Sequence, residues 1–415
     1  PARLPPRNRL QGPPLVSHLR APDPAPAPSA RGARSVGERR PGAAMPLPFP
    51  CPDPSDSLSI PWDDLLREPW APPMAACPQD PEHHAEGDVW THTKMVCEAL
   101  VRLPAWQALP AEGREVVFVA CLLHDIAKPI TTRIEDGRIR QPGHSPKGAI
   151  MARELLWQAG VDPATRERVA ALVRTHQIPF FLIEDQDPLR RAAAISQTVR
   201  CDHLALVTRA DALGRICKDP QKLLDNIDLF SEFCAEQDCL DRPFAFPSDH
   251  SRFTYFRTPG RDPRYLAHDD TRCEVVVMSG LPGSGKDHWI AHNLDLPVVS
   301  LDAIREEHDL APTGPQHAVI QAAREQAREH LRRAQSFVWN ATNLTRDLRG
   351  RVIELAADYH ARVRIVFLDT ARRRQQRQNR EREAAVPAAA LQRMLRVWEP
   401  PDATEAHRVD WIVQT

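Results

Sequence analysis

Apolar residues recur at helical spacing from Trp62 to about Cys239. Pro129 is expected to end the first long helix of this region, and Ser145 and Pro146 are expected to begin the next as N-cap and first-turn residues. The pattern predicts helices over 113–128, 149–158, 162–174, 190–200 and 203–218. This part of the chain is therefore predicted to be an all-α domain.

A different pattern begins at residue 273, where short apolar runs alternate with helical stretches. Strands are predicted over CEVVVMSG at 273–280 and over Val298–Leu301, Phe337–Trp339 and Val363–Leu368. Strand–helix alternation of this kind favours an α/β domain with a parallel sheet covered by helices. Residues 240–272 between the two regions are aromatic and extended, and we expect a connector there that could include a hairpin.

The N-terminal segment is rich in Pro and Arg and has no sustained apolar periodicity. Such a composition cannot bury enough surface to offset the entropy of ordering, so disorder is expected. The segment could be a basic arm that tethers nucleic acid, a linker, or sequence upstream of a true start at Met45. The predicted organisation is a disordered segment (1–54), a helical domain (55–239), a connector (240–272) and an α/β domain (273–415).

The composition limits the classes of function. Lys and Arg number 54 against 55 Asp and Glu, so the formal net charge of -1 provides no overall cationic field for nucleic acid or membranes. The apolar runs fall far short of the roughly 20 residues that a membrane helix needs. Nine cysteines without a CxxC pair fit neither a disulfide framework nor a thiolate zinc site. We expect a soluble, cytoplasmic protein with no membrane partner, in which any nucleic-acid site is a local basic patch.

The segment Gly280–Lys286, GLPGSGK, fits the phosphate loop GxxxxGK. It follows a predicted strand and precedes a predicted helix, so its backbone N–H groups and the helix N-terminus can hold phosphates. The predicted site for ATP or another NTP with Mg²⁺ comprises Gly280, Gly283, Ser284, Gly285, Lys286 and Asp287. Asp287 stands where Ser or Thr would offer Mg²⁺ a hydroxyl. Its carboxylate can bind the metal directly or through water but repels phosphates, which leaves metal and nucleotide preference open.

The acceptor of the phosphoryl group is expected at the carboxyl ends of the next strands. Asp302 and Arg305 lie three residues apart at the start of a helix, where the carboxylate could accept a hydroxyl proton and the guanidinium could bind a phosphate. Asn340 and Asn343 in the following loop are candidates for acceptor contacts. The alternatives are an N-cap with a solvated Arg for the first pair and turn formers for the second.

An arginine-rich stretch follows the strand that ends near Leu368. Its arginines are Arg372, Arg373, Arg374, Arg377, Arg380 and Arg382. Helical spacing puts Arg373, Arg377 and Arg380 along one face, which suits a lid that neutralises the transferring phosphate, with Arg380 as the chief contributor. The alternative interpretation is a solvated charged helix.

A set of histidines and carboxylates in the helical region indicates a metal site. Its members are His92, His124, Asp125, His144, His176 and Asp211. Imidazoles and carboxylates without thiolates suit Mn, Fe, Co, Ni or Zn at a hydrolytic site. A metal-bound water of lowered pKa would attack phosphorus there, and Lys128, four residues beyond His124, could hold phosphate oxygens. Each histidine taken alone could instead be structural.

The motifs of the two predicted domains resemble those of two known families. WTHT, LLHDIAK, the later histidines and Asp211 resemble the HD-domain metal-dependent phosphohydrolases. That resemblance implies that His92, the His124–Asp125 pair and Asp211 bind one metal. The intervening histidines, His144 and His176, can serve a second metal or protonate the leaving group. GLPGSGK, LDAIR and the arginine-rich stretch resemble P-loop polynucleotide kinases, which implies Asp302 as general base and Arg305 as ligand of the phosphate beside a 5′-OH.

The order of the two parts is similar to that of the bacterial HD-Pnk end-healing enzymes. The resemblance implies that the HD domain removes a 2′,3′-cyclic phosphate or 3′-phosphate with a divalent transition metal such as Mn²⁺, Co²⁺ or Ni²⁺. It also implies that the kinase phosphorylates a 5′-OH, so that RNA or DNA ends and a separate ligase are the partners. One departure is Asn340, where phage-type kinases have an acidic residue.

Two other functions fit the same motifs. An HD nucleotidase or phosphodiesterase for small nucleotides could be fused to a small-molecule kinase, because both folds serve many substrates. Alternatively, the protein could be a nucleotide-regulated RNA-binding protein whose kinase is inactive because of Asp287. A phosphate beside the acceptor hydroxyl, as on a polynucleotide, would give Arg305 a ligand that a nucleoside lacks.

Overall fold

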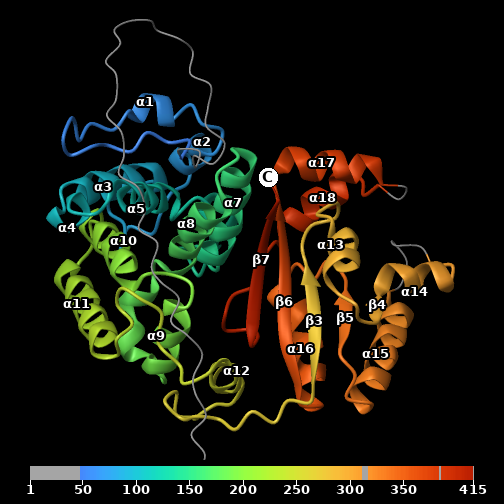
Figure 1. Ribbon diagram of the computed structural model, residues 1–415. Helices are drawn as coiled ribbons and strands as arrows, with labels where there is room; N and C mark the ends of the chain where they lie inside the picture. The colour runs from blue at the N-terminus through green and yellow to red at the C-terminus, as the bar shows by residue number, and fades with distance from the viewer. Residues whose placement is uncertain (1–46, 311–315, 383–384, 415) are drawn as a thin grey trace, which may run out of the picture. The chain divides into compact units, whose positions relative to one another are not determined.

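The computed structural model describes residues 47–310, 316–382 and 385–414 (Figure 1). Most of the segment expected to be disordered, residues 1–54, lies outside these ranges. Within them, Leu47 and Phe49 are buried in the same core as the helices that follow. The helical domain therefore begins before the boundary expected at residue 55.

The helical domain is confirmed. Its helices are α1 (Trp62–Leu65), α2 (Ala71–Ala75), α3 (Val89–Val101), α4 (Pro104–Gln107), α5 (Ala111–Leu123), α6 (Lys128–Thr131), α7 (His144–Gln158), α8 (Pro163–Thr175), η1 (Ile178–Phe180), η2 (Leu182–Glu184), α9 (Pro188–Ser196), α10 (Cys201–Leu213) and α11 (Pro220–Glu236). Side chains of α3, α5, α8 and α10 share one apolar core. The packing of this core fixes the positions of the candidate metal-binding residues that these helices carry.

Two helix boundaries differ from the sequence prediction. Helix α5 ends at Leu123, and the chain turns before α6, in which Pro129 occupies the first turn instead of ending a long helix. Proline is tolerated at that position because the first N–H groups of a helix have no intrahelical partner. Helix α7 begins at His144, after Gly143 in the left-handed conformation, so Ser145 and Pro146 lie within its first turn.

A small hairpin that the sequence analysis did not anticipate links α6 to α7. Strands β1 (Arg133–Glu135) and β2 (Arg138–Arg140) pair antiparallel. Asp136 and Gly137 between them both have positive φ, 52° and 74°. An Asp-Gly pair with this geometry matches the turn that fits the right-handed twist of two-residue hairpins.

The hairpin expected in the connector is wrong. Residues 249–257 form helix α12 (Asp249–Arg257), capped by Ser248, whose side chain accepts a hydrogen bond from Ser251 N. Phe253 of α12 packs in the core of the sheet domain, and Tyr255 packs in the core of the helical domain. Phe253 and Tyr255 are therefore buried, one in the core of each neighbouring domain.

The parallel sheet of the C-terminal domain is confirmed, with strand order β4-β5-β3-β6-β7 (Figure 1). Its strands are β3 (Cys273–Ser279), β4 (Val298–Ser300), β5 (Phe337–Asn340), β6 (Ala361–Thr370) and β7 (Arg408–Gln414). Its helices are α13 (Lys286–Asn293), α14 (Leu301–Glu307), α15 (His317–Arg332), α16 (Arg346–Asp358), α17 (Arg372–Glu381) and α18 (Ala388–Leu395). The edge strand β7 was not predicted from the sequence.

Helices cover both faces of this sheet, because successive side chains of a strand point to opposite sides. Val275 and Val277 of β3 belong to the apolar cluster that contains residues of α15 and α16. Val276 and Met278 belong to the cluster that contains Ile290 of α13. Both faces of β3 are thus buried, which explains its uninterrupted apolar run.

Helices α7 and α8 also contact the end of β6 and the segment after α18. Trp157 Nε1 donates to Thr370 O at 2.9 Å, and Arg153 Nη1 donates to Trp398 O at 3.0 Å. Arg166 forms an ion pair with Asp369 in which both side chains are almost fully buried. Such a pair is costly to break, because either charge alone would remain buried without compensation.

Candidate active sites

All the residues predicted to bind metal in the helical domain lie together. His92 comes from α3 and Asp211 from α10, whereas the others lie at helix ends: His124 and Asp125 follow α5, His144 begins α7 and His176 follows α8. All are buried. Side chains separated by more than a hundred residues along the chain thus meet inside the domain.

Asp125 is at the centre of this site. The Nε2 atoms of the histidines lie at the following distances from its carboxylate oxygens: His124 3.1 Å, His144 3.4 Å, His92 3.9 Å and His176 4.0 Å. Asp211 Oδ1 lies 3.1 Å from His92 Nε2. Two groups with metal-ligand spacing, His92–His124–Asp125 and Asp125–His144–His176, therefore share Asp125.

The hydrogen bonds of three histidines direct Nε2 toward this centre. The Nδ1 atoms of His124, His144 and His176 lie 2.7–2.8 Å from the backbone oxygens of Cys121, Gln141 and Val173. Because a carbonyl oxygen can only accept, each Nδ1 carries the proton and each Nε2 offers a lone pair. The buried Nε2 atoms of His124 and His144 make no hydrogen bond among the described residues. This donor set fits a divalent metal ion.

Neighbouring polar and charged groups keep both carboxylates ionised. Burial would raise the pKa of Asp125, but His124 and Lys128 hold it well below its usual range, and Lys128 Nζ lies 2.7 Å from Asp125 Oδ2. Burial would likewise raise the pKa of Asp211, which Arg215 and His92 hold well below its usual range. Anionic carboxylates are the form that binds metal.

Burial has the opposite effect on the histidines. It lowers the pKa of His176 to about 3, and the neighbouring His124 and His144 lower it further. Burial also lowers the pKa of His144. Both rings are therefore neutral near pH 7, as metal binding requires.

Several residues of this site were not predicted from the sequence. Arg215 Nη2 donates to Asp211 Oδ1 at 2.8 Å, and Gln79 Oε1 accepts from Lys128 Nζ at 2.6 Å. Glu86 Oε1 lies 2.8 Å from the Nδ1 atoms of both His84 and His92. Only Arg215 carries a sequence signal, because it follows Asp211 by one helical turn.

A glycine allows α10 to approach α3 closely. A Cβ at Gly214 would lie 2.5 Å from Val96 N, which is too close for any other residue without a shift of backbone. The carbonyl of Gly214 also accepts from His92 Nδ1 at 3.2 Å. This contact brings Asp211 within reach of His92.

The predicted phosphate loop joins β3 to α13. Gly285, with φ of 81°, is the N-cap of α13, and Lys286 is its first residue. Lys286 Nζ donates to the oxygens of Gly280 and Leu281 at 3.1 and 3.2 Å. Burial lowers the pKa of Lys286 to about 8, although Asp287 opposes the shift. The ammonium thus lies over the loop, where phosphates would bind.

Other loop residues lie around it. Ser284 is buried, and its Oγ makes no hydrogen bond in the described part of the chain. Asp287 Oδ1 accepts from Asn340 Nδ2 at 2.6 Å, so these two unusual residues contact each other. Their carboxylate and amide oxygens fit a magnesium ion. Asn343, with φ of 43°, donates from Nδ2 to Met278 O at 2.7 Å. The acceptor contacts expected of Asn340 and Asn343 stay predictions.

Asp302 and Arg305 lie on α14, which follows β4 at the carboxyl edge of the sheet. They form an ion pair, and Asp302 is exposed. Arg305 Nε also donates to Gln316 Oε1 at 2.6 Å. Arg382 Nη2 lies 4.0 Å from Asp302 Oδ2. Among the arginines of the predicted lid, Arg382 thus has a described contact with the candidate acceptor site.

Helix α17 packs directly on the phosphate loop. Gln375 Nε2 donates to Pro282 O at 2.7 Å, and a Cβ at Gly283 would lie 2.9 Å from Asn379 N. These contacts use the buried face of the helix. Arg373, Arg377 and Arg380 are exposed on its other side. The helix is therefore placed as a lid would be, whereas the role expected of Arg380 stays a prediction.

Two protein families match separate parts of the chain. Residues 89–216 match the HD domain family, and residues 275–401 match an AAA domain family. The chain joins an HD domain to a P-loop kinase-like domain. Among the described residues, no helix is both long and apolar enough to cross a membrane.

Individual proteins match parts of the chain. The CC-adding tRNA nucleotidyltransferase of Thermus thermophilus is 39% identical over 134 residues, which are 32% of this chain and 28% of the relative. The bifunctional uridylyltransferase/uridylyl-removing enzyme of Bradyrhizobium diazoefficiens is 35% identical over 109 residues, 25% of this chain and 11% of the relative. The chain thus spans less than a third of either curated relative. A solved sugar kinase from Janibacter sp. HTCC2649 aligns at 22% identity with a TM-score of 0.25, covering 34% of this chain and 83% of that one.

Proposed function

We propose that the chain heals broken nucleic-acid ends. The HD domain would remove a 3′-phosphate or 2′,3′-cyclic phosphate, and the kinase domain would transfer a phosphoryl group from an NTP to a 5′-OH. The main support is the presence in one chain of a His/Asp metal site and a phosphate loop with an Asp–Arg pair beside it. Hydrolysis and phosphorylation together would give both ends of a break the form that a ligase requires.

In the HD domain, His92, His124, Asp125 and Asp211 would hold a divalent metal, and His144 and His176 would complete a second position around Asp125. The chemistry that a metal held by these residues would supply is the activation of water as the nucleophile. Lys128 and Arg215 are cations beside the two carboxylates, where they would bind the phosphate oxygens of the substrate.

In the kinase domain, Lys286 and the loop N–H groups would hold the donor phosphates. Asp287 would hold Mg²⁺, with Asn340 fixing its carboxylate. Asp302 would accept the proton of the 5′-OH, and Arg305 would bind a phosphate next to that hydroxyl. A polynucleotide acceptor would supply this phosphate, whereas a nucleoside would not. Arg382 would stabilise the charge of the transferring group.

The test is mass spectrometry of one RNA oligonucleotide with a 5′-OH and a 3′-phosphate. It would be incubated with the protein, ATP and Mg²⁺, and in separate tubes with added Mn²⁺, Co²⁺ or Ni²⁺. We expect gain of a 5′-phosphate together with loss of the 3′-phosphate, the latter dependent on the added metal. The same oligonucleotide as DNA would report the preference for the sugar.

Two results would contradict the proposal. If both ends stay unchanged while mononucleotides are hydrolysed or nucleosides are phosphorylated in parallel tubes, the substrates are small molecules. If neither end reacts although ATP binds, the kinase domain has a regulatory role.

A further inference from the structure

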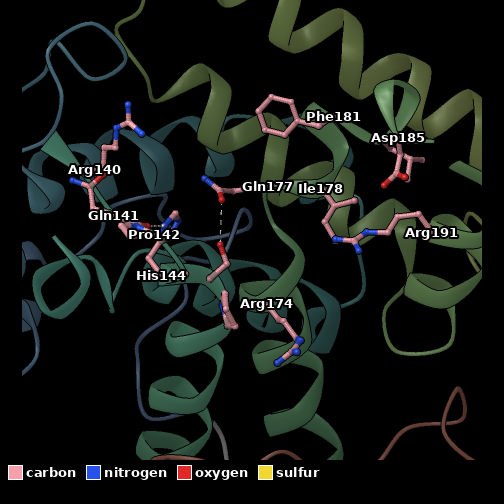
Figure 2. Close-up of a pocket in the computed structure, with 14 residues that line it drawn as sticks. Arg140, Gln141, Pro142, His144, Arg174, Gln177, Ile178, Phe181, Asp185 and Arg191 are labelled. Atoms are coloured by element: carbon pink, nitrogen blue, oxygen red, sulfur yellow. Dashed lines mark hydrogen bonds between the residues drawn. The ribbon is translucent and has the colours of Figure 1, made fainter. Parts of the chain in front are cut away.

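A cavity of about 690 Å³ opens beside the HD site (Figure 2). Its volume falls in the range of about 300–1,000 Å³ that is usual for ligand sites. His144 lines this cavity, and its Nε2 lies 3.4 Å from Asp125 Oδ1. A ligand in the cavity could therefore reach the metal-binding residues without a change in the fold.

The lining of the cavity is cationic. It contains the guanidinium groups of Arg140, Arg174 and Arg191 and the carboxylate of Asp185. Arg140 lies at the limit of pairing, 4.0 Å from Glu135, and Arg174 Nη1 lies 3.3 Å from Glu399. Arg191 has no ion pair in the described ranges. All three arginines are exposed, so Arg140 and Arg174 can exchange these weak surface contacts for phosphate oxygens, and Arg191 can bind them directly.

An exposed aromatic ring lies in the same lining. Phe181 is 59% exposed, whereas its neighbours Phe180 and Leu182 are 2% and 1% exposed. The backbone at this point is also fixed from α11, because Asn226 Nδ2 donates to Phe180 O at 2.7 Å. The two buried neighbours thus anchor a short segment that presents the Phe181 ring toward solvent. In Figure 2 the Phe181 ring lies above Gln177 and Ile178.

Exposed aromatic rings among arginines are the elements of single-strand binding, because bases stack on the rings and phosphates pair with the cations. We propose that this cavity binds the single-stranded segment preceding a 3′ end, with one base stacked on Phe181 and backbone phosphates against Arg140, Arg174 and Arg191. The proposal rests on the proposed function, since it requires the terminal phosphate to lie at the HD site. Its consequence is that the HD domain prefers an oligonucleotide to a mononucleotide.

The test compares two substrates of the full-length protein: a mononucleotide 2′,3′-cyclic phosphate and a hexanucleotide RNA with the same cyclic end. We expect kcat/KM of the wild type to be higher for the hexanucleotide. In Phe181→Ala, the ratio of the two kcat/KM values should fall at least about tenfold, which is the lower part of the range for loss of one stacked base. In Arg191→Gln, the ratio should fall and the salt dependence of hexanucleotide hydrolysis should weaken by about one unit of slope.

Matched control variants lie on the same domain outside the cavity. Leu66→Ala removes an exposed apolar side chain, and Arg67→Gln removes an exposed guanidinium that pairs with Asp64. Both should retain the wild-type ratio and salt dependence. Unchanged melting temperatures in Phe181→Ala and Arg191→Gln would show that these variants fold.

The outcomes separate this proposal from the proposed function. If the wild type hydrolyses neither substrate, or only the mononucleotide, the end-healing function itself fails. If the wild type hydrolyses both and Phe181→Ala keeps the ratio, or lowers both values equally, end healing stands and the assignment of the cavity is overturned.

Discussion

The charge of Lys286 should make nucleotide binding depend on pH. Burial lowers the pKa of this ammonium to about 8, with Asp287 opposing the shift. The group is charged below that pH and attracts phosphates, and it loses the charge as the pH rises through about 8. We therefore expect the Kd for ATP to rise about tenfold from pH 7 to pH 9, in proportion to the lost ammonium. Isothermal titration calorimetry at both pH values measures this change.

The control for this prediction is Lys286→Arg. A guanidinium stays charged throughout the range, so the variant should bind ATP with a Kd that hardly changes between the two pH values, even if its affinity is lower. An equal pH dependence in both proteins would assign the effect to another group.

Glu86 should control the affinity of the HD site for metal. Its Oε1 lies 2.8 Å from His92 Nδ1, and its Oε2 accepts from Ile216 N at 2.9 Å. A carboxylate that accepts from the far nitrogen of a ligating histidine orients the ring and increases its basicity. Glu86→Gln should therefore weaken metal binding by about 10- to 100-fold. Competition with a chromophoric chelator measures this affinity without reference to activity.

The matched control is Glu82→Gln, four residues upstream, where the carboxylate forms an exposed ion pair with Arg138. This variant should bind metal as the wild type does. Equal affinities in all three proteins would show that His92 needs no orienting carboxylate.

At the scale of elements, the contact between α3 and α10 should depend on Gly214. An added Cβ would meet backbone atoms of Val96 at 2.5 and 2.7 Å, so one helix must move. We expect Gly214→Ala to lower stability by about 1–3 kcal/mol, as overpacking does, and to displace Asp211 from His92. Phosphoester hydrolysis should fall and 5′-phosphorylation should stay, as measured on the same oligonucleotide.

Gly350→Ala is the control for this change. Gly350 lies in α16, and a Cβ there would meet nothing within 4 Å. Alanine at an unhindered helical position should stabilise by up to about 1 kcal/mol. Thermal unfolding that shows equal effects of the two substitutions would contradict the close packing of α3 against α10.

Some helices and strands could be predicted from the sequence and others could not, for physical reasons. The apolar run of β3 predicts a buried strand because both of its faces are covered. Strand β7 gives no such run, since Arg408 and Asp410 alternate with half-buried apolar residues at an edge. Helix α12 was missed because its aromatic residues pack in two different cores, which leaves no single apolar face.

The same distinction applies to the sites. The grouping of the candidate metal-binding residues and the strand–loop–helix setting of GLPGSGK could be predicted, because LLHDIAK and GLPGSGK are short motifs in a fitting context. The roles of these residues stay predictions. Gln79 could not be predicted, because it meets Lys128 only when segments 49 residues apart fold together. Glu86 could not either, because it precedes α3 and no helical spacing relates it to His92. Arg380 was predicted to be the chief arginine of the lid. Arg382 lies near Asp302 because it directly follows the end of α17, and helical spacing alone does not show where that helix ends.

At the scale of the molecule, the helices that carry the candidate metal-binding residues also contact the kinase-like domain. Helix α7 begins with His144 and contains Trp157, and α8 contains Arg166 and leads to His176. Trp157 and Arg166 contact Thr370 and Asp369 at the end of β6, directly before α17. Yet the main apolar cores of the two domains are separate, so the loss of one catalytic side chain leaves the other domain packed.

The two activities should therefore be separable by single substitutions. Lys286→Ala removes the ammonium proposed to hold the donor phosphates, and we expect 5′-phosphorylation to fall at least about 100-fold while 3′-dephosphorylation stays. Asp125→Asn keeps the shape of the residue but removes the charge shared by both metal-ligand groups, and we expect the reverse result. Mass spectrometry of an oligonucleotide with both reactive ends reads the two activities in one sample. Loss of both activities in either variant, with the fold intact by circular dichroism, would mean that a single site performs both reactions or that the contact through β6 couples them.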